Sequence, residues 1–170
     1  MYDGHFAAPW GSWRPSFGAL IDADESGWNG YTLRVIITNN YIMLDGNLVR
    51  LRLNGPSSGQ SVIGAMYFGT RSGTYAFNGD QVPVTVGGSG SFNLGAGVTY
   101  SDPFAFALDE GNDIVLAMQM TGTSSLRYKS GYDIASYYKS GTDASTTAAT
   151  GYSSNSSSTL YTFDLIEVFP

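Results

Sequence analysis

Apolar and polar residues alternate along much of this chain, which is the pattern of a β-strand with one buried face and one face in water. In the clearest example, Val49, Leu51 and Leu53 fall on one side of an extended chain. Arg50 and Arg52 fall on the other side. We therefore expect a strand whose aliphatic face packs into the core and whose arginines face solvent.

Short runs rich in β-branched and aromatic residues recur along the chain, separated by turns that contain Gly, Asn or Asp. Their spacing of roughly 8–12 residues, without a long window of helical periodicity, is typical of antiparallel sandwiches and barrels. The sequence therefore predicts an all-β fold, an antiparallel β-sandwich of about nine strands. The predicted strands are residues 31–38, 48–53, 62–68, 81–86, 91–94, 104–108, 114–120, 125–128 and 159–169.

Three segments depart from this regular pattern. Residues 133–140 are framed by glycines and predict a short helical turn within a longer loop. Residues 142–158 are rich in Ser and Thr and predict a mobile or ligand-facing loop. In the last strand the alternation breaks at Leu165 and Ile166, which predicts a β-bulge. We expect this last strand to pair near the beginning of the chain.

The first 28 residues lack sustained periodicity and contain all three tryptophans and the single histidine. We expect residues 1–28 to form an extended N-terminal arm and residues 29–170 to form the sandwich domain. Trp10, Trp13 and Phe17 have two interpretations. They are anchors that dock the arm onto a partner, since Trp is enriched in interface hot spots, or they fold over the domain's own core. The sequence favours docking.

Composition narrows the class of protein. The chain has 170 residues, 14% of them aromatic and only 13% charged, so a single folded domain is expected rather than disorder. It contains no Cys, which excludes disulfides and thiolate metal sites. The net charge of -6 argues against nucleic acid and anionic membranes as partners. No apolar run approaches the ~20 residues of a spanning helix.

Catalytic and metal-binding chemistry finds little support in the sequence. A Ser/His/Asp arrangement would need His5, which lies in the terminal segment without a paired Ser and Asp. The acidic run 109–113 is first of all typical of a turn between two strands. Carboxylates of this kind also catalyse glycoside hydrolysis and bind calcium in other proteins. Residues 22–25 offer similar oxygens without EF-hand spacing. We expect no enzyme activity, no catalytic residue, no metal ligand and no cofactor, with a structural calcium ion as the open alternative.

Aromatic residues are better candidates for binding. Four tyrosines cluster within eleven residues of a Gly/Ser-rich region, next to an arginine. Sugars are bound by flat aromatic faces together with polar groups, so this composition suits a glycan. The alternative is that the tyrosines cover the end of the sandwich or pack against a neighbouring subunit. The candidate carbohydrate-binding residues are Arg127, Tyr128, Tyr132, Tyr137 and Tyr138.

A series of strand and turn phrases between Leu48 and Met120 carries a family resemblance. The phrases are, in order, VRLRL, VIGAMYFG, VPVTVGG, FNLGAG, SDP and DIVLA. Over about residues 31–169 the chain resembles the carbohydrate-binding-like jelly-roll domain that lies upstream of the catalytic domain in GDSL/SGNH-type esterases. It is also similar to copies of that domain in virion proteins of tailed phages and gene-transfer agents. The Gly-Asp-Ser-Leu phrase of the esterase is absent.

The resemblance implies a jelly-roll-type sandwich with the role of the accessory domain. We expect a non-catalytic virion structural protein of a tailed phage or phage-like particle, as a capsid decoration or a tail or fibre component. Binding of host-surface glycans is a further expected role. Other virion proteins or further copies of this chain are the expected partners.

The expected location follows from the start of the chain. The first thirteen residues contain no Lys or Arg, and no apolar run of about seven residues follows them. We therefore expect no signal peptide, synthesis in the host cytoplasm and a place in the virion. The alternative is an extracellular carbohydrate-binding module, detached from a cell-surface or secreted esterase.

Overall fold

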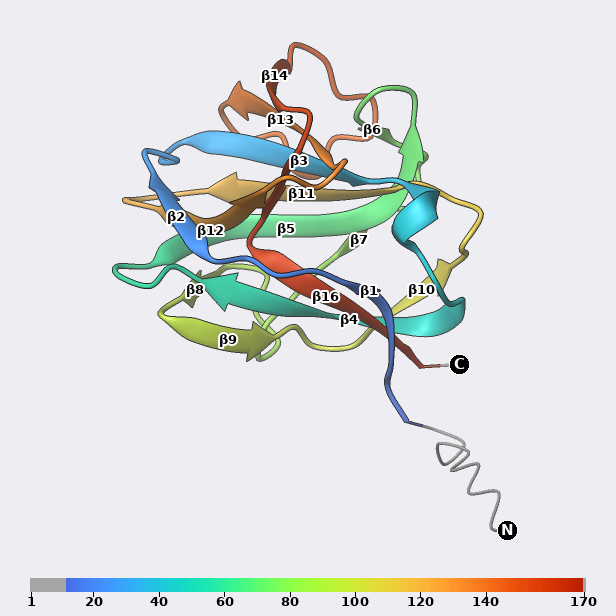
Figure 1. The fold of residues 1–170 in the computed structure, drawn as a ribbon. Helices are drawn as coiled ribbons and strands as arrows, with labels where there is room; N and C mark the ends of the chain where they lie inside the picture. The colour runs from blue at the N-terminus through green and yellow to red at the C-terminus, as the bar shows by residue number, and fades with distance from the viewer. Residues whose placement is uncertain (1–11, 170) are drawn as a thin grey trace, which may run out of the picture.

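The computed structural model describes residues 12–169, which form an antiparallel β-sandwich (Figure 1). This confirms the predicted all-β fold. The described residues contain sixteen short strands and one 3-10 turn, Asn39–Tyr41. No helix within residues 12–169 is long and apolar enough to span a membrane.

One layer is a five-stranded sheet in the order β1-β16-β4-β10, with β9 also paired to β4. The first and last strands are neighbours, with Arg14 opposite Val168, which confirms the predicted pairing of the chain ends. The strands of this sheet are β1 (Arg14–Gly18), β16 (Phe163–Phe169), β4 (Gly46–Gly55), β10 (Phe104–Leu108) and β9 (Gly97–Tyr100).

The second layer is an eight-stranded sheet in the order β14-β13-β3-β11-β5-β6, with β7 and β8 paired to β5. A small three-stranded sheet, β15-β12-β2, lies at one side of the sandwich (Figure 1). The strands of these two sheets are β14 (Ser153–Ser156), β13 (Ala135–Ser140), β3 (Tyr31–Ile37), β11 (Ile114–Met120), β5 (Ser61–Ser72), β6 (Ala76–Phe77), β7 (Val82–Pro83), β8 (Phe92–Leu94), β15 (Thr159–Tyr161), β12 (Ser125–Ser130) and β2 (Ala23–Ser26).

The core lies between the two large sheets. Val49, Leu51 and Leu53 are fully buried, whereas Arg50 and Arg52 on the opposite face form ion pairs with Glu167 and Asp164 at 2.7 Å. The one-sided burial predicted from their alternation is therefore confirmed.

The eight-stranded sheet is covered on both faces. Its second face carries a smaller apolar cluster beneath β6 and the segment 141–152. This second cover explains why every residue of β11 from Ile114 to Met118 is buried, since a strand with two covered faces has no polar side. The buried members of the second cluster are Ile36, Phe77, Val115, Ala117 and Ala144.

Residues 14–28 belong to the sandwich, so the predicted arm is wrong for this part of the segment. β1 pairs with β16 and β2 pairs with β12, and Phe17 is only 1% exposed. Both strands are short and lie at sheet edges, where the neighbouring strand supplies the hydrogen bonds. A sequence pattern of four or five residues is too short to reveal this. Residues 1–11 lie outside the described part of the chain.

Two loop predictions are also corrected. Residues 135–140 form strand β13 rather than a helical turn, because β3 offers a full row of backbone partners to this edge. The Ser/Thr-rich segment 142–158 contains strand β14, paired to β13.

The last predicted strand is divided in two at Thr162, whose φ of 67° turns the chain between β15 and β16. The break in register lies between Phe163 and Leu165, one to two residues before the predicted bulge. The turn is held on both sides: the Thr162 amide donates to the Arg127 carbonyl at 2.8 Å, and the Asn54 amide donates to the Thr162 carbonyl at 2.5 Å.

Candidate ligand-binding site

A small hollow with aromatic walls is lined by residues of β2, of the turn that leads from β2 into β3, and of β3, β13 and β14. Figure 1 shows where these strands lie in the sandwich. Its volume is about 200 Å³. We call it the aromatic cup. Its lining residues are Glu25, Ser26, Gly27, Trp28, Tyr31, Tyr138 and Asn155.

The turn between β2 and β3 sets one wall of the cup. Gly27 and Gly30 both have positive φ, 95° and 77°, a conformation that residues with a side chain rarely adopt. The Gly30 amide donates to the Met120 carbonyl at 3.1 Å and its carbonyl accepts from the Gly141 amide at 2.8 Å. The turn is thereby fixed to the sheet, and Trp28 within it is only 7% exposed.

Strand register brings the two tyrosines of the cup together. Ser140 on β13 lies opposite Tyr31 on β3, so Tyr138, two residues earlier, is a diagonal neighbour on the same face. The Tyr31 and Tyr138 ring centroids are 5.8 Å apart. Each ring also meets Trp28 nearly at right angles, with centroids 6.3 Å apart in both pairs.

A hydrogen-bonded chain holds the polar side of the cup. The Tyr161 hydroxyl donates to Glu25 Oε2 at 2.8 Å and accepts from Asn155 Nδ2 at 2.8 Å. Asn155 Nδ2 also lies 3.2 Å from Ser136 Oγ. Burial raises the pKa of Tyr161, and its bond to the Glu25 carboxylate raises that pKa further. Tyr161 is therefore a neutral donor that fixes Glu25 at neutral pH.

The Glu25 carboxylate can accept further hydrogen bonds or pair with a cation. Within residues 12–169 it forms no ion pair, and Tyr161 is the only side chain that donates to it. One carboxylate oxygen therefore stays available beside the aromatic rings. Because the cup is smaller than the roughly 300 Å³ at which ligand pockets usually begin, it suits one ring-sized or smaller group.

The structure separates the five predicted glycan residues. Tyr138 lines the cup, and Tyr128 lies behind it, stacked on Tyr161 with centroids 5.8 Å apart. Tyr132 lies elsewhere and accepts a hydrogen bond from the Leu20 amide at 2.8 Å. Arg127 is held in an ion pair with Asp24 at 3.0 Å. The residues therefore do not form one continuous surface.

Tyr137 is directed to the other face of the sheet, because neighbouring residues of a strand point in opposite directions. It packs against Tyr75 with ring centroids 5.1 Å apart, next to the second apolar cluster. This position matches the alternative interpretation, in which a tyrosine covers part of the sandwich.

The candidate docking residues of the N-terminal segment lie in different environments. Phe17 is a core residue, with its ring 5.6 Å from that of Phe163, so it is not available to a partner. Trp13 packs at the surface against Phe169 and against the Arg50 guanidinium, 4.4 Å from the ring centroid. Trp10 lies outside the described residues.

Several residues of the cup were missed by the sequence analysis. Glu25 and Trp28 fall in the predicted arm, and Tyr31 falls in the first predicted strand. Tyr161, which holds Glu25 from outside the lining, falls in the last predicted strand. Only Asn155 lies in a segment predicted to face a ligand. A usable signal was the placement of Glu25 and Trp28 around a glycine, directly before the first clear strand.

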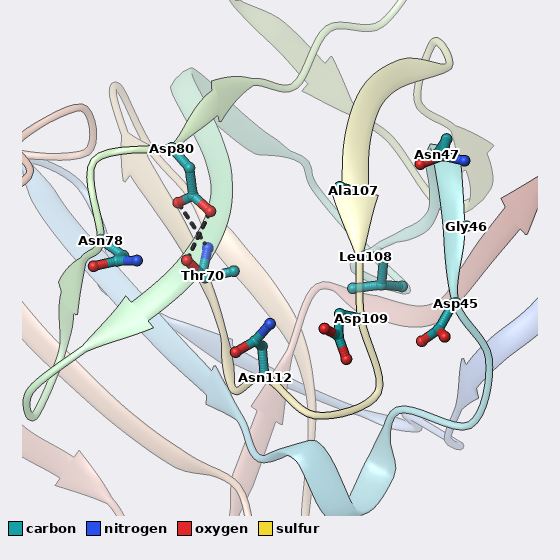
Figure 2. Close-up of a pocket in the computed structure, with 10 residues that line it drawn as sticks. All are labelled: Asp45, Gly46, Asn47, Thr70, Asn78, Asp80, Ala107, Leu108, Asp109 and Asn112. Carbon is teal, nitrogen blue, oxygen red and sulfur yellow. Dashed lines mark hydrogen bonds between the residues drawn. The ribbon is translucent and has the colours of Figure 1, made fainter.

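A larger hollow of about 620 Å³ lies between β4, β10 and the β5–β7 connection (Figure 2). Its lining is polar and contains no aromatic ring. Each of its carboxylates accepts hydrogen bonds from the chain: Asp80 from the Thr70 amide and hydroxyl, Asp109 from the Gly111 amide at 2.7 Å and Asp45 from the Glu110 amide at 2.7 Å. This hollow therefore lacks the stacking surface that a sugar or planar ligand needs.

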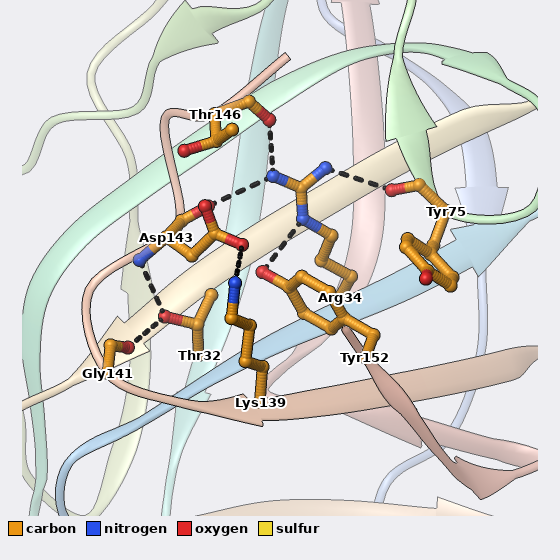
Figure 3. A network of polar contacts seen from close by, with 8 residues as sticks. All are labelled: Thr32, Arg34, Tyr75, Lys139, Gly141, Asp143, Thr146 and Tyr152. Atoms are coloured by element: carbon orange, nitrogen blue, oxygen red, sulfur yellow. Dashed lines mark hydrogen bonds and ion pairs between the residues drawn. The ribbon is translucent and has the colours of Figure 1, made fainter. Parts of the chain in front are cut away.

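Arg34 forms the most extensive polar network of the eight-stranded sheet (Figure 3). Although fully buried, it donates to the carbonyls of Tyr75, Asp143 and Thr146 at 2.5–3.0 Å and to the Tyr152 hydroxyl at 3.1 Å. Its guanidinium lies 4.7 Å from the Phe77 ring centroid and 5.2 Å from that of Tyr152. Arg34 therefore fastens the segment 141–152 to the sheet.

Metal ligands are not clustered in the described part of the chain. Within residues 12–169, no group of three or more His, Asp or Glu side chains is arranged to hold a metal ion. In the acidic segment 22–25, Asp22 pairs with Lys129 and Asp24 pairs with Arg127. In the other acidic turn, Asp113 pairs with Arg71 at 2.8 Å. The expectation that the chain uses no cofactor stays a prediction.

Neither protein-family models nor curated proteins match this chain. The resemblance to the accessory domain of GDSL/SGNH-type esterases and to phage virion proteins therefore stays a prediction.

Proposed function

We propose that this chain is a non-catalytic β-sandwich component of a tailed phage or phage-like particle, and that it binds host-surface glycans through the aromatic cup. The observation that carries the binding part is the cup itself. Its rings offer flat faces for a sugar, and Glu25 and Asn155 offer polar groups at the rim. This combination of aromatic surface and a few fixed polar groups is what small-ligand sites use.

The place in a particle rests on the resemblance stated above. A weak site for one sugar becomes useful when many copies are presented together, because linked sites raise the effective concentration of the ligand. Virion proteins provide such repetition. We therefore propose self-association or assembly with other virion proteins as the context in which the cup acts.

Light scattering and a glycan array on the same purified chain test the two parts separately. We expect an oligomer and a defined set of bound sugars. A monomer that binds sugars would replace the virion role with that of a carbohydrate-binding module. An oligomer without any bound sugar would remove the glycan function and leave a structural role.

Two neighbouring tyrosines locate the binding site. Tyr138→Ala removes a wall of the cup, and Tyr137→Ala removes a half-buried ring from the opposite face of the same strand. We expect array binding to fall at least tenfold for Tyr138→Ala, about the effect of losing one stacked ring. Binding should be kept by Tyr137→Ala. Equal binding by both variants would place the sugar elsewhere and contradict the cup.

A further inference from the structure

We infer that the aromatic cup selects a positively charged group, either a quaternary ammonium or the protonated amine of an amino sugar. This inference rests on the proposed function and names the class of ligand that the same site takes. Three observations carry it: the arrangement of the rings, the free carboxylate and the size of the hollow.

The three rings of the cup pack edge to face around the hollow. Trp28 makes interplanar angles of 81° with Tyr31 and 88° with Tyr138, and the two tyrosines make an angle of 64° with each other. The centroids are separated by 6.3, 6.3 and 5.8 Å. The three pairs are therefore edge-to-face rather than stacked, and the inclined rings border the hollow from different sides. Cations bind ring faces within about 6 Å.

The charge in the lining of the cup is negative. Glu25 is the charged residue of the lining, and within residues 12–169 no Lys or Arg pairs with it. The bases on the neighbouring strand β12 are already occupied, since Arg127 pairs with Asp24 and Lys129 pairs with Asp22. An anionic sugar would meet the carboxylate without compensation, whereas a cation would be attracted by both the carboxylate and the rings.

The size of the hollow limits the group that enters. A volume of about 200 Å³ holds a trimethylammonium group or a single amine-bearing sugar ring. Both present the same chemistry to the cup, a cation with a surface that packs against aromatic faces. Choline substituents of surface polymers and non-acetylated amino sugars are the two sources.

Titration calorimetry on the full chain tests this selection with four probes: choline chloride, glucosamine, glucose and glucuronate. We expect at least one of the two cationic probes to bind at least tenfold more tightly than glucose, and glucuronate to bind most weakly. Choline binding alone would identify the quaternary ammonium as the source, and glucosamine binding alone would identify the amino sugar. Equal affinity for glucose and for the cations would overturn the inference and leave the proposed glycan function intact.

Glu25→Gln and Asp24→Asn form a matched pair of variants. Each removes one negative charge from β2, but Glu25 lines the cup whereas Asp24 pairs with Arg127 outside it. We expect Glu25→Gln to weaken the cationic probe about tenfold, as expected for the loss of a desolvated charge contact. Asp24→Asn should change it by less than about twofold. Equal losses in both variants would overturn the inference, because they would report net charge rather than the cup.

Tyr31→Leu supplies a second variant if Glu25→Gln does not fold. Leu keeps apolar volume but removes a ring face, so cation binding should fall by at least about fivefold. Unchanged cation binding would overturn the inference. If no probe and no sugar on the array binds the unaltered chain, the proposed glycan function and this inference both fail.

Discussion

The Arg34 network and the aromatic cup lie on opposite faces of the same strand, β3, and both combine aromatic rings with one charged group. In the network, the chain supplies a cation, two ring faces and acceptors for four of the five guanidinium N–H groups. In the cup, it supplies rings and a carboxylate that receives one hydrogen bond within residues 12–169. A charged group whose hydrogen bonds are mostly made within the chain fastens the fold, whereas an open site with few such bonds can bind a ligand.

The difference follows from what covers each face. The segment 141–152 lies over Arg34 and brings the carbonyls of Asp143 and Thr146 with it. Tyr152, at the end of that segment, adds its hydroxyl, and Tyr75 adds a third carbonyl from the turn before β6. The cup lies at the end of the sandwich, where the chain turns from β2 to β3 and no further segment of the described residues lines it beyond β14. Substitutions in the two sites should therefore have opposite effects on stability and binding.

Arg34→Met should give the largest loss of stability, about 3–5 kcal/mol, because one buried and two partly buried carbonyls lose their donor and a buried cation is removed from its site. Arg71→Met is the control, since Arg71 forms a half-exposed ion pair with Asp113 and should cost less than about 1 kcal/mol. Urea unfolding measures both. Similar losses would show that the two arginines have the same role, which would break the comparison.

Tyr152→Phe should cost about 1–2 kcal/mol, because the Arg34 Nε donor loses its hydroxyl acceptor while the ring face is kept. Equilibrium unfolding at neutral pH measures the loss. A variant as stable as the unaltered chain would mean that the hydroxyl contributes nothing to holding Arg34.

The same variant should change the alkaline stability. Burial raises the pKa of Tyr152 to about 12, from 10.0 when exposed. The folded state therefore favours the neutral phenol, and this contribution is complete below about pH 10 and is lost as pH rises toward 12. Unfolding midpoints at about pH 9 and about pH 11.5 should differ less for Tyr152→Phe than for the unaltered chain. An equal fall of the unfolding midpoint in both proteins would show that other groups cause the loss of stability at alkaline pH.

Glu25→Gln should have the smallest effect, less than about 0.5 kcal/mol on the free energy of unfolding. The amide oxygen of Gln still accepts from Tyr161, and no ion pair within the described residues is broken. Thermal unfolding of the variant measures this. A loss as large as that of Arg34→Met would make Glu25 a structural residue and remove the contrast between the two sites.

Local sequence patterns predicted the strands that lie inside a sheet, between neighbouring strands on both sides. β11 was predicted with its observed ends, residues 114–120, because a continuous apolar run bounded by turns has few other solutions. The first clear strand was confirmed from its β-branched run, and the strand around Leu51 was confirmed from its alternation of apolar and polar residues. The edge strands β1, β2 and β14, and β13 beside β14, were not predicted, because backbone partners far away in the sequence, rather than their own side chains, fix their conformation.

The candidate site was predictable only in part. Tyr138 was identified from the density of tyrosines, but the same argument also selected Tyr137, which the alternation of β13 places on the other face. The partners of Tyr138 in the cup lie more than a hundred residues earlier, at Trp28 and Tyr31. Composition cannot predict such a meeting, because it depends on which strands become neighbours.

The sequence by itself determined the all-β class, the buried face of β4 and the turn-rich, Cys-free character of the domain, because these follow from side-chain period and residue type. The tertiary structure decided which charged and aromatic residues are buried and which lie next to one another. Alternation alone would place Arg34 on a polar face, yet a segment from residue 141 onward buries it. In the sequence Glu25 is one of several acidic residues, yet strand pairing places it in the cup with the rings of Trp28, Tyr31 and Tyr138. Burial and pairing are set by long-range packing, which a local pattern does not contain.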